Sequence, residues 1–461
     1  MQRNETDGKA DEMKRLQTPL LLFLLSCVPA SNPTPLPAPL PSVIDPKDEE
    51  LLEDLSRRSF QYFWEQSSSF TGLTLDRARS DGSTHDEHHR NAASIAATGF
   101  GLTAMCIAAE RGWAPGEKIR ERVRRTLRFL ANRVFHKNGW FYHWLHLETG
   151  ERQWTSEVSS IDTALLLAGV LTCRQYFASD SEIVQLATRI YDRVDFNWMR
   201  NGHPTLLSHG WTPEDGFLPI RWDTYSEHTI LYLLAIGSRT HPIPPDSWHA
   251  WKRDPNRYAG YEFIGRAPLF THQYSHAWVE YRGRRETCGT GIDYFENSVT
   301  ATWAHRRFCL DLREQFPSYS EDLWGITASD SRNGYVAWGG PPPQGPLDGT
   351  VVPCAAAGSL MLAPEICLPV LRNLRWNFGD RIYGRYGFVD AFNPILDWVG
   401  PDVVGIDVGI TLLSIENFRT GRVWRWFMQN PEIPVAMEKV GLKRVRLEKR
   451  SHLQKAAVDR G

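Results

Sequence analysis

Three acidic residues stand at the points where apolar helices are expected to begin. They are Asp162 in "SEVSSIDTALLLAG", Glu227 in "YSEHTILYLLAIG" and Asp407 in "GIDVGITLL". Ser159-x-x-Asp162 and Thr224-x-x-Glu227 fit the capping box, in which an acid in the first turn accepts a backbone N–H and interacts favourably with the helix dipole. A cap needs only one acid per helix. Acids from several helices that converge on one cleft could instead do chemistry.

Glycoside hydrolysis is the chemistry that a pair of such acids supports. One carboxyl group protonates the leaving oxygen, and the other activates water or attacks the anomeric carbon. Glu227 is the predicted general acid, because Trp222 and Tyr225 would desolvate it and Asp223 adds a like charge. Both effects raise the pKa of a carboxyl group. The alternative for Glu227 is a helix cap only.

Asp407 is the predicted base that activates water. It is flanked by apolar residues and by Gly405 and Gly409, which have no side chain and would let a ligand approach closely. The alternative is a loop acid whose oxygens accept backbone N–H groups. Asp162 is the third catalytic candidate, with the same choice between chemistry and a cap.

Aromatic side chains that could stack on sugar rings are abundant: the chain has 18 Trp, 15 Tyr and 21 Phe. Many must lie in the core, but Trp among polar neighbours also suits a sugar-binding surface. For the acids Glu157, Glu296 and Glu416 a structural or binding role is expected rather than catalysis. The predicted substrate-binding residues are Glu157, Trp154, Trp211, Trp222, Tyr225, His228, His272, Tyr274, His276, Glu296, Asn297, Trp338 and Glu416.

Other chemistries have less support. Two histidine groups could hold a metal, "DEHHR" at 86–90 and the i, i+4 pair of His272 and His276, but no third ligand is near either of them and no HExxH is present. We therefore predict no metal and no cofactor. The sequence also has no GxSxG elbow, Walker loop or GxGxxG, so Ser-based triads and nucleotide sites are not indicated.

Charge and the N-terminal segment bear on location and partners. The net charge is −2 over 461 residues, with no long basic block, which argues against nucleic acid and anionic membrane surfaces as partners. "MKRLQTPLLLFLLSC" is typical of a secretory leader, with an apolar stretch too short to span a bilayer. "LLSC" resembles a lipobox, which would make Cys27 a lipidated anchor. The alternative is an unprocessed apolar helix.

The domain boundaries follow from composition. Residues 1–27 are the expected leader, with Met13 as an alternative start, and residues 28–46 are a Pro-rich linker. One domain is expected over 47–440, followed by a basic tail at 441–461. The leader, the anchor and the linker together predict a protein of the bacterial envelope, periplasmic or outer-membrane, or a secreted one.

A recurring pattern predicts the fold. Six times, a polar loop leads into a helix rich in small and apolar residues, and amphipathic segments such as 115–135 and 180–199 lie between. Alternating buried and half-exposed helices predict an all-α (α/α)6 toroid, with short β-hairpins and loops on the rim where the inner helices begin. The six expected inner segments are 91–113, 159–177, 224–238, 295–312, 349–362 and 405–421.

Seven motifs in order resemble the bacterial glycoamylase-like family, which includes endo-β-1,2-glucanases and a domain of cyclic β-1,2-glucan synthases. They are "ASIAATGFGLTA", "SEVSSIDTALLLAG", "YSEHTILYLLAIGS", "FTHQYSHAW", "ENSVTATWAHRRFC", "WGITASDSRNGY" and "GIDVGITLLSIENFRTGRVWRWFM", between about residues 48 and 437. The resemblance implies an (α/α)6 barrel, no metal, and inverting cleavage of β-1,2-glucan. By motif it places Glu227 as the general acid and Asp162 and Asp407 on the catalytic rim. Family members commonly read "GIDQGP" where this chain reads "GIDVGI".

The sequence therefore predicts a glycoside hydrolase that acts on a β-glucan, most simply an endo-acting, inverting enzyme for β-1,2-glucan. Two alternatives stay open from the sequence. One is a transglycosylase of the same fold, and the other is a non-catalytic glycan-binding envelope lipoprotein. The sequence gives no oligomeric state.

Overall fold

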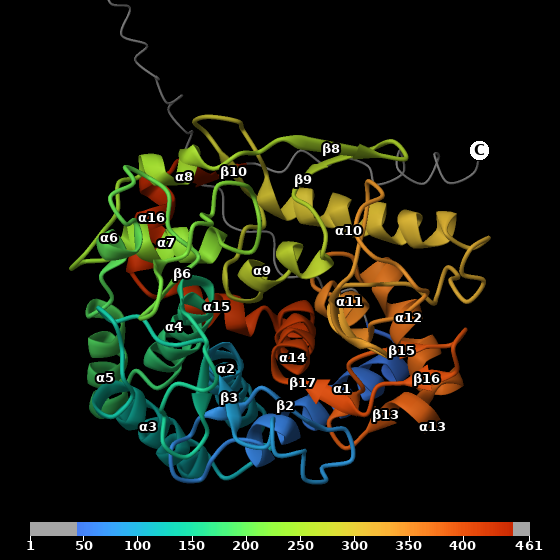
Figure 1. The fold of residues 1–461 in the computed structure, drawn as a ribbon, viewed down its shortest axis with the longest axis horizontal. Coiled ribbons are helices and arrows are strands. Elements are labelled where there is room, and N and C mark those ends of the chain that lie inside the picture. The colour runs from blue at the N-terminus through green and yellow to red at the C-terminus, as the bar shows by residue number, and fades with distance from the viewer. Residues whose placement is uncertain (1–43, 446–461) are drawn as a thin grey trace, which may run out of the picture.

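The computed structural model describes residues 44–445, and its centre is a ring of helices that are buried on all sides (Figure 1). Almost every residue of these helices is buried because their sequences are apolar or small throughout. The inner helices are α2 (Ile95–Arg111), α4 (Ser160–Tyr176), α7 (Thr229–Gly237), α9 (Tyr274–Trp278), α11 (Pro353–Gly358) and α14 (Gly405–Thr420).

Amphipathic helices surround this ring. In α3 (Gly116–Asn132), for example, the buried residues Ile119, Val123 and Leu127 follow each other at four-residue intervals, and charged residues fill the exposed face. The expected (α/α)6 arrangement is confirmed. The other helices are α1 (Pro46–Glu65), α5 (Ser181–Asp192), α6 (Phe196–Met199), α8 (Asp246–Ala250), α10 (Tyr294–Asp311), α12 (Pro364–Asn377), α13 (Gly379–Ile382), α15 (Arg422–Met428) and α16 (Glu432–Lys439), with a 3₁₀ turn at Leu269–His272.

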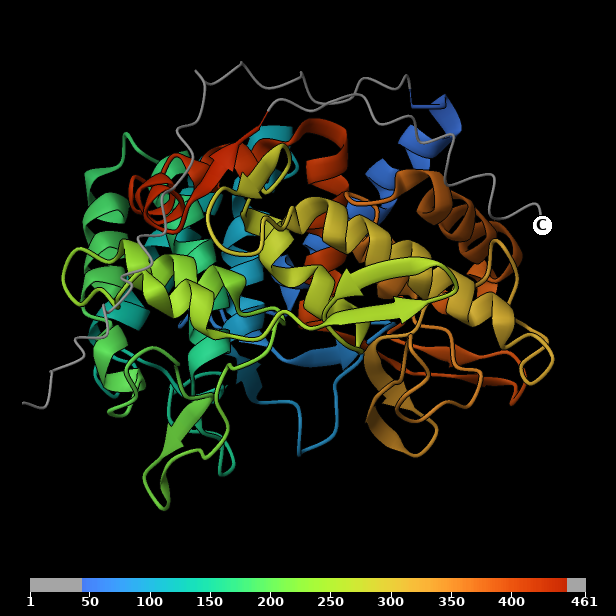
Figure 2. The ribbon, with the colours of Figure 1, turned by 90° about the horizontal axis from the view of Figure 1, so that it is seen from above.

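One inner segment was predicted in the wrong place. The segment 295–312 forms α10, which buries one face only and lies near the edge of the molecule (Figure 1). The hairpin of β8 (Pro255–Tyr258) and β9 (Tyr261–Ile264) packs against it (Figure 2). The short helix α9 takes the inner place, against α14 and α15. The physical reason is charge: α10 carries Arg306, Arg307 and Asp311, which need solvent, whereas "YSHAW" of α9 is buried entirely.

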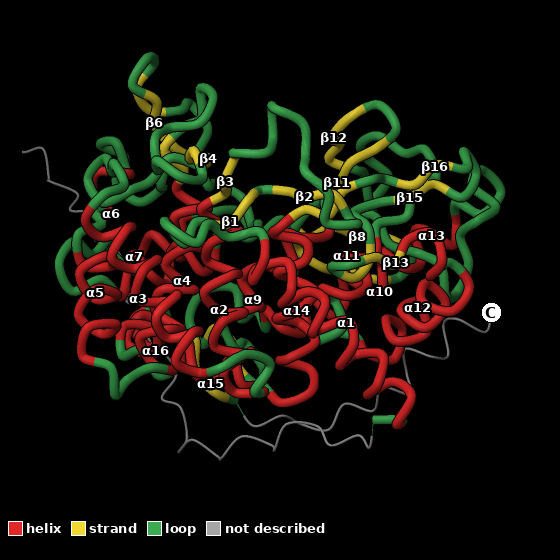
Figure 3. Tube along the Cα trace, turned by 90° about the horizontal axis from the view of Figure 1, so that it is seen from below, coloured by secondary structure: helices red, strands yellow, loops and turns green. Residues whose placement is uncertain are grey.

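Short strands and loops cover one end of the helix ring, as expected (Figure 3). Three inner helices start there directly after a strand, because β3 leads into α2, β5 into α4 and β17 into α14. This end is called the rim below. Its strands pair antiparallel as β1–β3–β4, β5–β6–β7 and β2–β17. Apart from β8 and β9, the strands of the described residues, on the rim and elsewhere, are β1 (Thr74–Leu75), β2 (Arg77–Arg79), β3 (Ala92–Ser94), β4 (Trp144–His146), β5 (Val158–Ser159), β6 (Gly210–Thr212), β7 (Gly216–Phe217), β10 (Arg284–Glu286), β11 (Ala328–Ser331), β12 (Gly334–Ala337), β13 (Tyr383–Gly384), β14 (Gly387–Phe388), β15 (Phe392–Asn393), β16 (Trp398–Val399), β17 (Asp402–Val404) and β18 (Leu442–Arg444).

The inner helices approach one another closely through glycines. A Cβ atom built on Gly169 of α4 would lie 2.1 Å from the backbone oxygen of Gly99 on α2, far inside van der Waals contact. The two helices can therefore pack at this distance only because both positions lack a side chain.

Cys106, Cys173, Cys309, Cys354 and Cys367 are free and buried, where they pack as small apolar residues do. Between residues 44 and 445, no helix is long and apolar enough to span a membrane. The predicted leader with Cys27, most of the linker and most of the basic tail lie outside the described residues.

Candidate active site

Glu227 lies in the turn that precedes α7, not inside the helix. The predicted capping box is wrong, because α7 begins at Thr229, its N-cap is His228, and no side chain caps it. Thr224 Oγ1 donates instead to Asp223 Oδ1 at 3.2 Å. The carboxyl group of Glu227 is therefore not used as a helix cap and is available for another role.

The surroundings of Glu227 favour its protonated form. The residue is 8% exposed, and burial raises the pKa of its carboxyl group. The hydroxyl of Ser226, which donates to Oε2, opposes this effect, whereas the charge of Asp162 adds to it. Ser275 Oγ fixes the turn by donating to the backbone oxygen of Glu227 at 2.5 Å. A carboxylic acid that stays protonated is what a general acid requires.

Asp162 lies in the first turn of α4, as predicted. Ser159 is the N-cap, and its Oγ accepts the N–H of Asp162 at 3.2 Å and donates to Asp162 Oδ2 at 2.5 Å. The reciprocal arm of a capping box is missing, because the Ser159 N–H donates to Phe141 O. The second carboxylate oxygen of Asp162 is thus turned away from the cap, toward His143.

His143, which was not among the predicted site residues, bridges two of the predicted acids. Its Nδ1 lies 3.0 Å from Glu157 Oε1, and its Nε2 lies 3.4 Å from Asp162 Oδ1. Burial disfavours the imidazolium, but the charges of Asp162 and Glu157 outweigh it and raise the pKa of His143 to about 8. The ring of Trp144 stacks on it with centroids 3.5 Å apart. At neutral pH, a cation therefore lies between the two carboxylates.

Two groups of side chains have metal-like donor spacing within residues 44–445. In each group the donor atoms lie within 4.8 Å of one another. The first group is His85, Asp86 and His89. Both ring nitrogens of His85 are already hydrogen-bonded, one to Asp402 at 2.9 Å and the other to the backbone N–H of Asp86 at 2.8 Å. In the second group, His143 already pairs with both Glu157 and Asp162. The absence of a metal requirement stays a prediction from the sequence.

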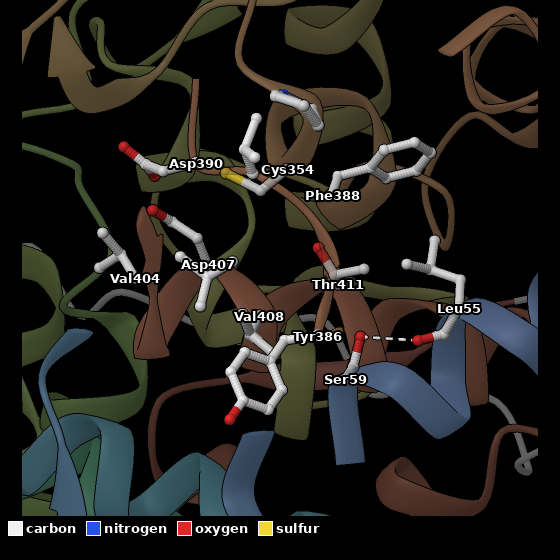
Figure 4. Close-up of a pocket in the computed structure, with 13 residues that line it drawn as sticks. Leu55, Ser59, Cys354, Tyr386, Phe388, Asp390, Val404, Asp407, Val408 and Thr411 are labelled. Carbon is white, nitrogen blue, oxygen red and sulfur yellow. Dashed lines mark hydrogen bonds between the residues drawn. The ribbon is translucent and has the colours of Figure 1, made fainter. Parts of the chain in front are cut away.

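Asp407 lies in the first turn of α14 and is 5% exposed. Burial raises the pKa of its carboxyl group to about 6, although the neighbouring side chains of Asp390, Cys354 and Tyr274 offset part of the effect. Tyr274 Oη donates to Oδ1 at 3.3 Å. Figure 4 shows Asp390 and Cys354 beside the carboxyl group. Above pH 6 most of the Asp407 carboxyl groups are ionised, as a base must be.

The glycines beside Asp407 do not serve a ligand, which corrects the prediction. A Cβ on Gly409 would lie 2.4 Å from the ring of Phe100, and one on Gly405 would lie 2.8 Å from the Cβ of Ala97. Both positions therefore permit α14 to pack against α2. They position Asp407 by fixing its helix rather than by opening space for substrate.

The three predicted catalytic acids meet at the rim. The charge of Asp162 raises the pKa of Glu227. Burial raises the pKa of Tyr274, and the charges of Asp407 and Glu227 raise it further. Asp162 therefore acts on Glu227, and Glu227 and Asp407 both act on Tyr274, although 65 and 180 residues separate the three acids along the chain.

Some predicted binding residues stand on the rim with part of their surface open. Trp154 is half-buried and stacks on His88 with centroids 4.8 Å apart, and Trp211 of β6 is also half-buried. Trp154 also adopts a positive φ of 53°, which is uncommon for a bulky residue and indicates that the loop around it is held firmly. For these two residues, sugar stacking stays a prediction.

Other predicted binding residues support the rim from inside. Trp222 Nε1 donates to Ser160 Oγ at 2.9 Å, and Trp338 Nε1 donates to Ser329 Oγ at 2.9 Å. Tyr225, His228 and His272 are also buried, and Glu296 is exposed at the start of α10. Direct contacts of these residues with a glycan stay predictions.

Three further predicted binding residues are held by contacts within the protein, and glycan binding by them stays a prediction. Glu416 pairs with Arg111 at 2.6 Å, nine residues beyond Asp407 on α14, which is about 13 Å away from the rim end of that helix. His276 Nε2 bonds to Ser298 Oγ at 2.9 Å inside the core. Asn297 bonds to both backbone groups of Ile264, at 2.8 and 3.1 Å. These three residues hold the fold together.

Comparison with known proteins gives a consistent set of relatives. A curated exo β-1,2-glucooligosaccharide sophorohydrolase (non-reducing end) from Parabacteroides distasonis is 26% identical over 440 residues, which covers 85% of this chain. The chain spans 58% of the length of that relative. The solved endo-β-1,2-glucanase from Chitinophaga pinensis, a complex with sophorotriose and glucose, is 28% identical with a TM-score of 0.80, over 86% of this chain and 98% of that one.

A family match agrees with these relatives. The sequence model of the Glycoamylase family, described as "Putative glucoamylase", matches residues 219–431. The crystal structure of a "putative glucoamylase" from Bacteroides fragilis is 31% identical, with a TM-score of 0.78, over 88% of this chain and all of that one. At this identity and coverage, the chain belongs to the glycoamylase-like family that its seven motifs predicted.

Proposed function

We propose that this chain is a glycoside hydrolase that cleaves β-1,2-linked glucan. The observation that carries the proposal is the pair of buried carboxyl groups, Glu227 and Asp407, on one rim. Burial and a like charge raise the pKa of Glu227, and Asp407, with a pKa of about 6, is mostly ionised at neutral pH. One carboxyl group that gives a proton and one that takes a proton are the two groups that glycoside hydrolysis needs.

The mechanism assigns one proton transfer to each group. Glu227 gives its proton to the glycosidic oxygen as the bond from that oxygen to the anomeric carbon breaks. Asp407 takes a proton from the water whose oxygen forms the new bond to the same carbon. Both products then leave, and the two carboxyl groups recover their starting protonation from solvent.

His143 and its two carboxylates support this chemistry from the side. Because the imidazolium lies between Glu157 and Asp162, it limits the negative charge that Glu227 senses from Asp162. Asp162 remains a second candidate for the water-activating base. The polymer specificity rests on the relatives, one of which is described as an endo-acting β-1,2-glucanase and another as an exo-acting sophorohydrolase.

The direct test is release of reducing ends from linear β-1,2-glucan, with laminarin, a cellulose derivative and starch in parallel. Protein lacking residues 1–43 is suitable. Release from β-1,2-glucan alone supports the proposal. The product lengths then separate endo from exo action, and the anomeric form of the first product separates inversion from retention. Binding without release would favour a glycan-binding protein, and glucan products without new reducing ends would favour a transglycosylase.

We also propose an envelope-anchored or secreted location, because of the leader-like sequence that ends at Cys27. Expression in a bacterial host with labelled palmitate tests this proposal. Label in the wild-type protein that is lost in Cys27→Ala supports a lipid anchor, and no label in either protein contradicts it.

A further inference from the structure

Asp390 is a buried acid that faces Asp407 and was not among the residues predicted from sequence. It precedes β15 and is 3% exposed, and Asp407 is 5% exposed. The two residues line a small cavity of about 20 Å³ together with Leu55 and Ser59 of α1 and Thr411 of α14 (Figure 4). Figure 4 shows the two carboxyl groups beside each other at this cavity.

The hydrogen bonds leave one oxygen of each carboxyl group without another partner. Asp390 Oδ2 accepts the N–H of Asp330 at 2.6 Å, and Asp407 Oδ1 accepts the hydroxyl of Tyr274 at 3.3 Å. Asp390 Oδ1 and Asp407 Oδ2 are buried with no donor assigned to them. Two carboxylate oxygens accept but do not donate, so they can bond to each other only when one carries a proton.

The charges that face the pair do not allow both acids to ionise. Arg77 is the nearby cation, but it pairs with Asp330 at 3.0 Å and lies 3.7 Å from Asp402. Two buried like charges would therefore lack compensation, and in such a pair one carboxyl group keeps its proton. The other titratable groups facing the pair are Cys354, Tyr274 and Tyr335, which are neutral when protonated.

We infer that Asp390 is a neutral carboxylic acid whose proton is donated to Asp407 Oδ2, and that it is a positioning residue for the base of the reaction. Burial raises the pKa of Asp390 well above its usual range, and the charge of Asp407 raises it further, which agrees with this placement of the proton. Asp407 then receives one hydrogen bond on each oxygen, from Tyr274 and from Asp390, and so has a fixed orientation. The shared proton stands independently, whereas the role in positioning a base rests on the proposed function.

Infrared difference spectroscopy of the full chain tests the shared proton without any substrate. The wild-type protein and Asp390→Asn are compared at about pH 7. The expected difference contains the C=O stretch of a protonated carboxyl group, present in the wild type and absent in the variant. A difference that contains only carboxylate bands would overturn the inference, because Asp390 would then be ionised. Glu227→Gln is the matched control, since it removes a different buried acid and should leave the Asp390 band in place.

Kinetics on β-1,2-glucan test the positioning role. An asparagine keeps a neutral donor toward Asp407 and an acceptor for the Asp330 N–H. We therefore expect Asp390→Asn to retain kcat within about tenfold, and Asp390→Ala to lose about 10²-fold or more, the scale of general-base catalysis. The acid limb of the pH profile should stay near pH 6 in Asp390→Asn. A folded Asp390→Asn as inactive as Asp407→Asn would overturn the role, and so would a fully active Asp390→Ala.

The infrared test and the kinetic test can fail independently of each other. If the wild-type chain is inactive on every glucan, the proposed function fails, but the infrared difference still decides whether the proton is shared. If Asp390→Ala does not fold, which circular dichroism would reveal, the asparagine variant alone decides the kinetic outcome.

Discussion

The hydroxyl of Tyr274 donates a hydrogen bond to Asp407 Oδ1 across 3.3 Å, and this bond ties the short helix α9 to the first turn of α14. The charge of Glu227 also acts on the same phenol. Tyr274 is therefore the side chain that connects the surroundings of the predicted acid with those of the predicted base.

Removing this hydroxyl should weaken the base. In Tyr274→Phe, Asp407 loses a donor that lowers its pKa, so we expect the acid limb of the activity profile to move to higher pH and kcat to fall by about tenfold, in line with one lost hydrogen bond to a charged group. Kinetics across pH check this outcome. Tyr258→Phe is the control, because the Tyr258 hydroxyl bonds to Asp311 on the outer face. An unchanged profile in Tyr274→Phe would show that this bond does not act on Asp407.

Replacing the predicted acid should abolish turnover without unfolding the protein. Glu227→Gln keeps the shape of the side chain but cannot give up a proton, so we expect kcat on β-1,2-glucan to fall by about 10²–10⁴-fold. Glucan binding by calorimetry and the melting temperature should stay close to wild type. The exposed Glu262→Gln, which only loses its pair with Arg257, is the control. Wild-type turnover in Glu227→Gln would remove Glu227 as the acid.

The pH profile of kcat/KM should be bell-shaped. Asp407 acts when ionised, and its pKa is about 6, so activity should fall as pH drops through about 6. Glu227 acts when protonated, and because burial raises its pKa, the alkaline limb should lie above the ordinary range of a glutamate. Initial rates between pH 4 and 9 check both limbs. Activity that keeps rising below pH 5 contradicts the assignment of Asp407 as the base.

The raised pKa of Asp407 should lower the free energy of unfolding at neutral pH. Its pKa is raised from 3.8 to about 6 in the folded state, so the folded state binds more protons than the unfolded state between these pH values, and stability falls as pH rises through that window. Asp407→Asn should therefore raise the free energy of unfolding at pH 7 by up to about 3 kcal/mol. Denaturant titrations at pH 7 and near pH 4 check the sign, since the gain should vanish at the lower pH. A variant that is less stable at both pH values contradicts this account.

The contact of α2 with α4 should tolerate no side chain at its centre. In Gly169→Ala, the new methyl group would meet the backbone oxygen of Gly99, which cannot move without its helix. We expect a loss of about 1–3 kcal/mol in the free energy of unfolding, as for other overpacked sites. Gly116→Ala in α3 is the control, because a Cβ there meets no atom within 4 Å. Equal stability of the two variants would mean that the helices separate at little cost.

Most of the helical architecture could be predicted from sequence because it follows from local patterns. Unbroken apolar segments such as 159–177 and amphipathic ones such as 115–135 differ in periodicity, and that difference places them in the inner or outer layer. The segment 295–312 was misplaced because its small residues imitate an inner helix, and only the burial of the five-residue α9 shows which element faces the centre. A single helical turn has too few residues for a period to be recognised.

The sequence by itself determined the acids Asp162, Glu227 and Asp407, since an acid at the start of an apolar helix is visible in the chain. Only the tertiary structure decided what surrounds them. The side chain of His143 reaches Glu157 and Asp162 because the backbone N–H of His143 donates to the backbone oxygen of Glu157. This bond brings together two segments that are 14 residues apart along the chain.

The relation between Asp390 and Asp407 depends still more on the tertiary structure. Asp390 stands 17 residues before Asp407, ahead of a two-residue strand, and has no pattern that marks it. Its role depends on its burial and on its position beside Asp407, and these two features set which carboxyl group keeps a proton. Spacing along the chain predicts which residue types can do chemistry, but the desolvation and the neighbouring charges that fix their protonation arise only when distant segments pack together.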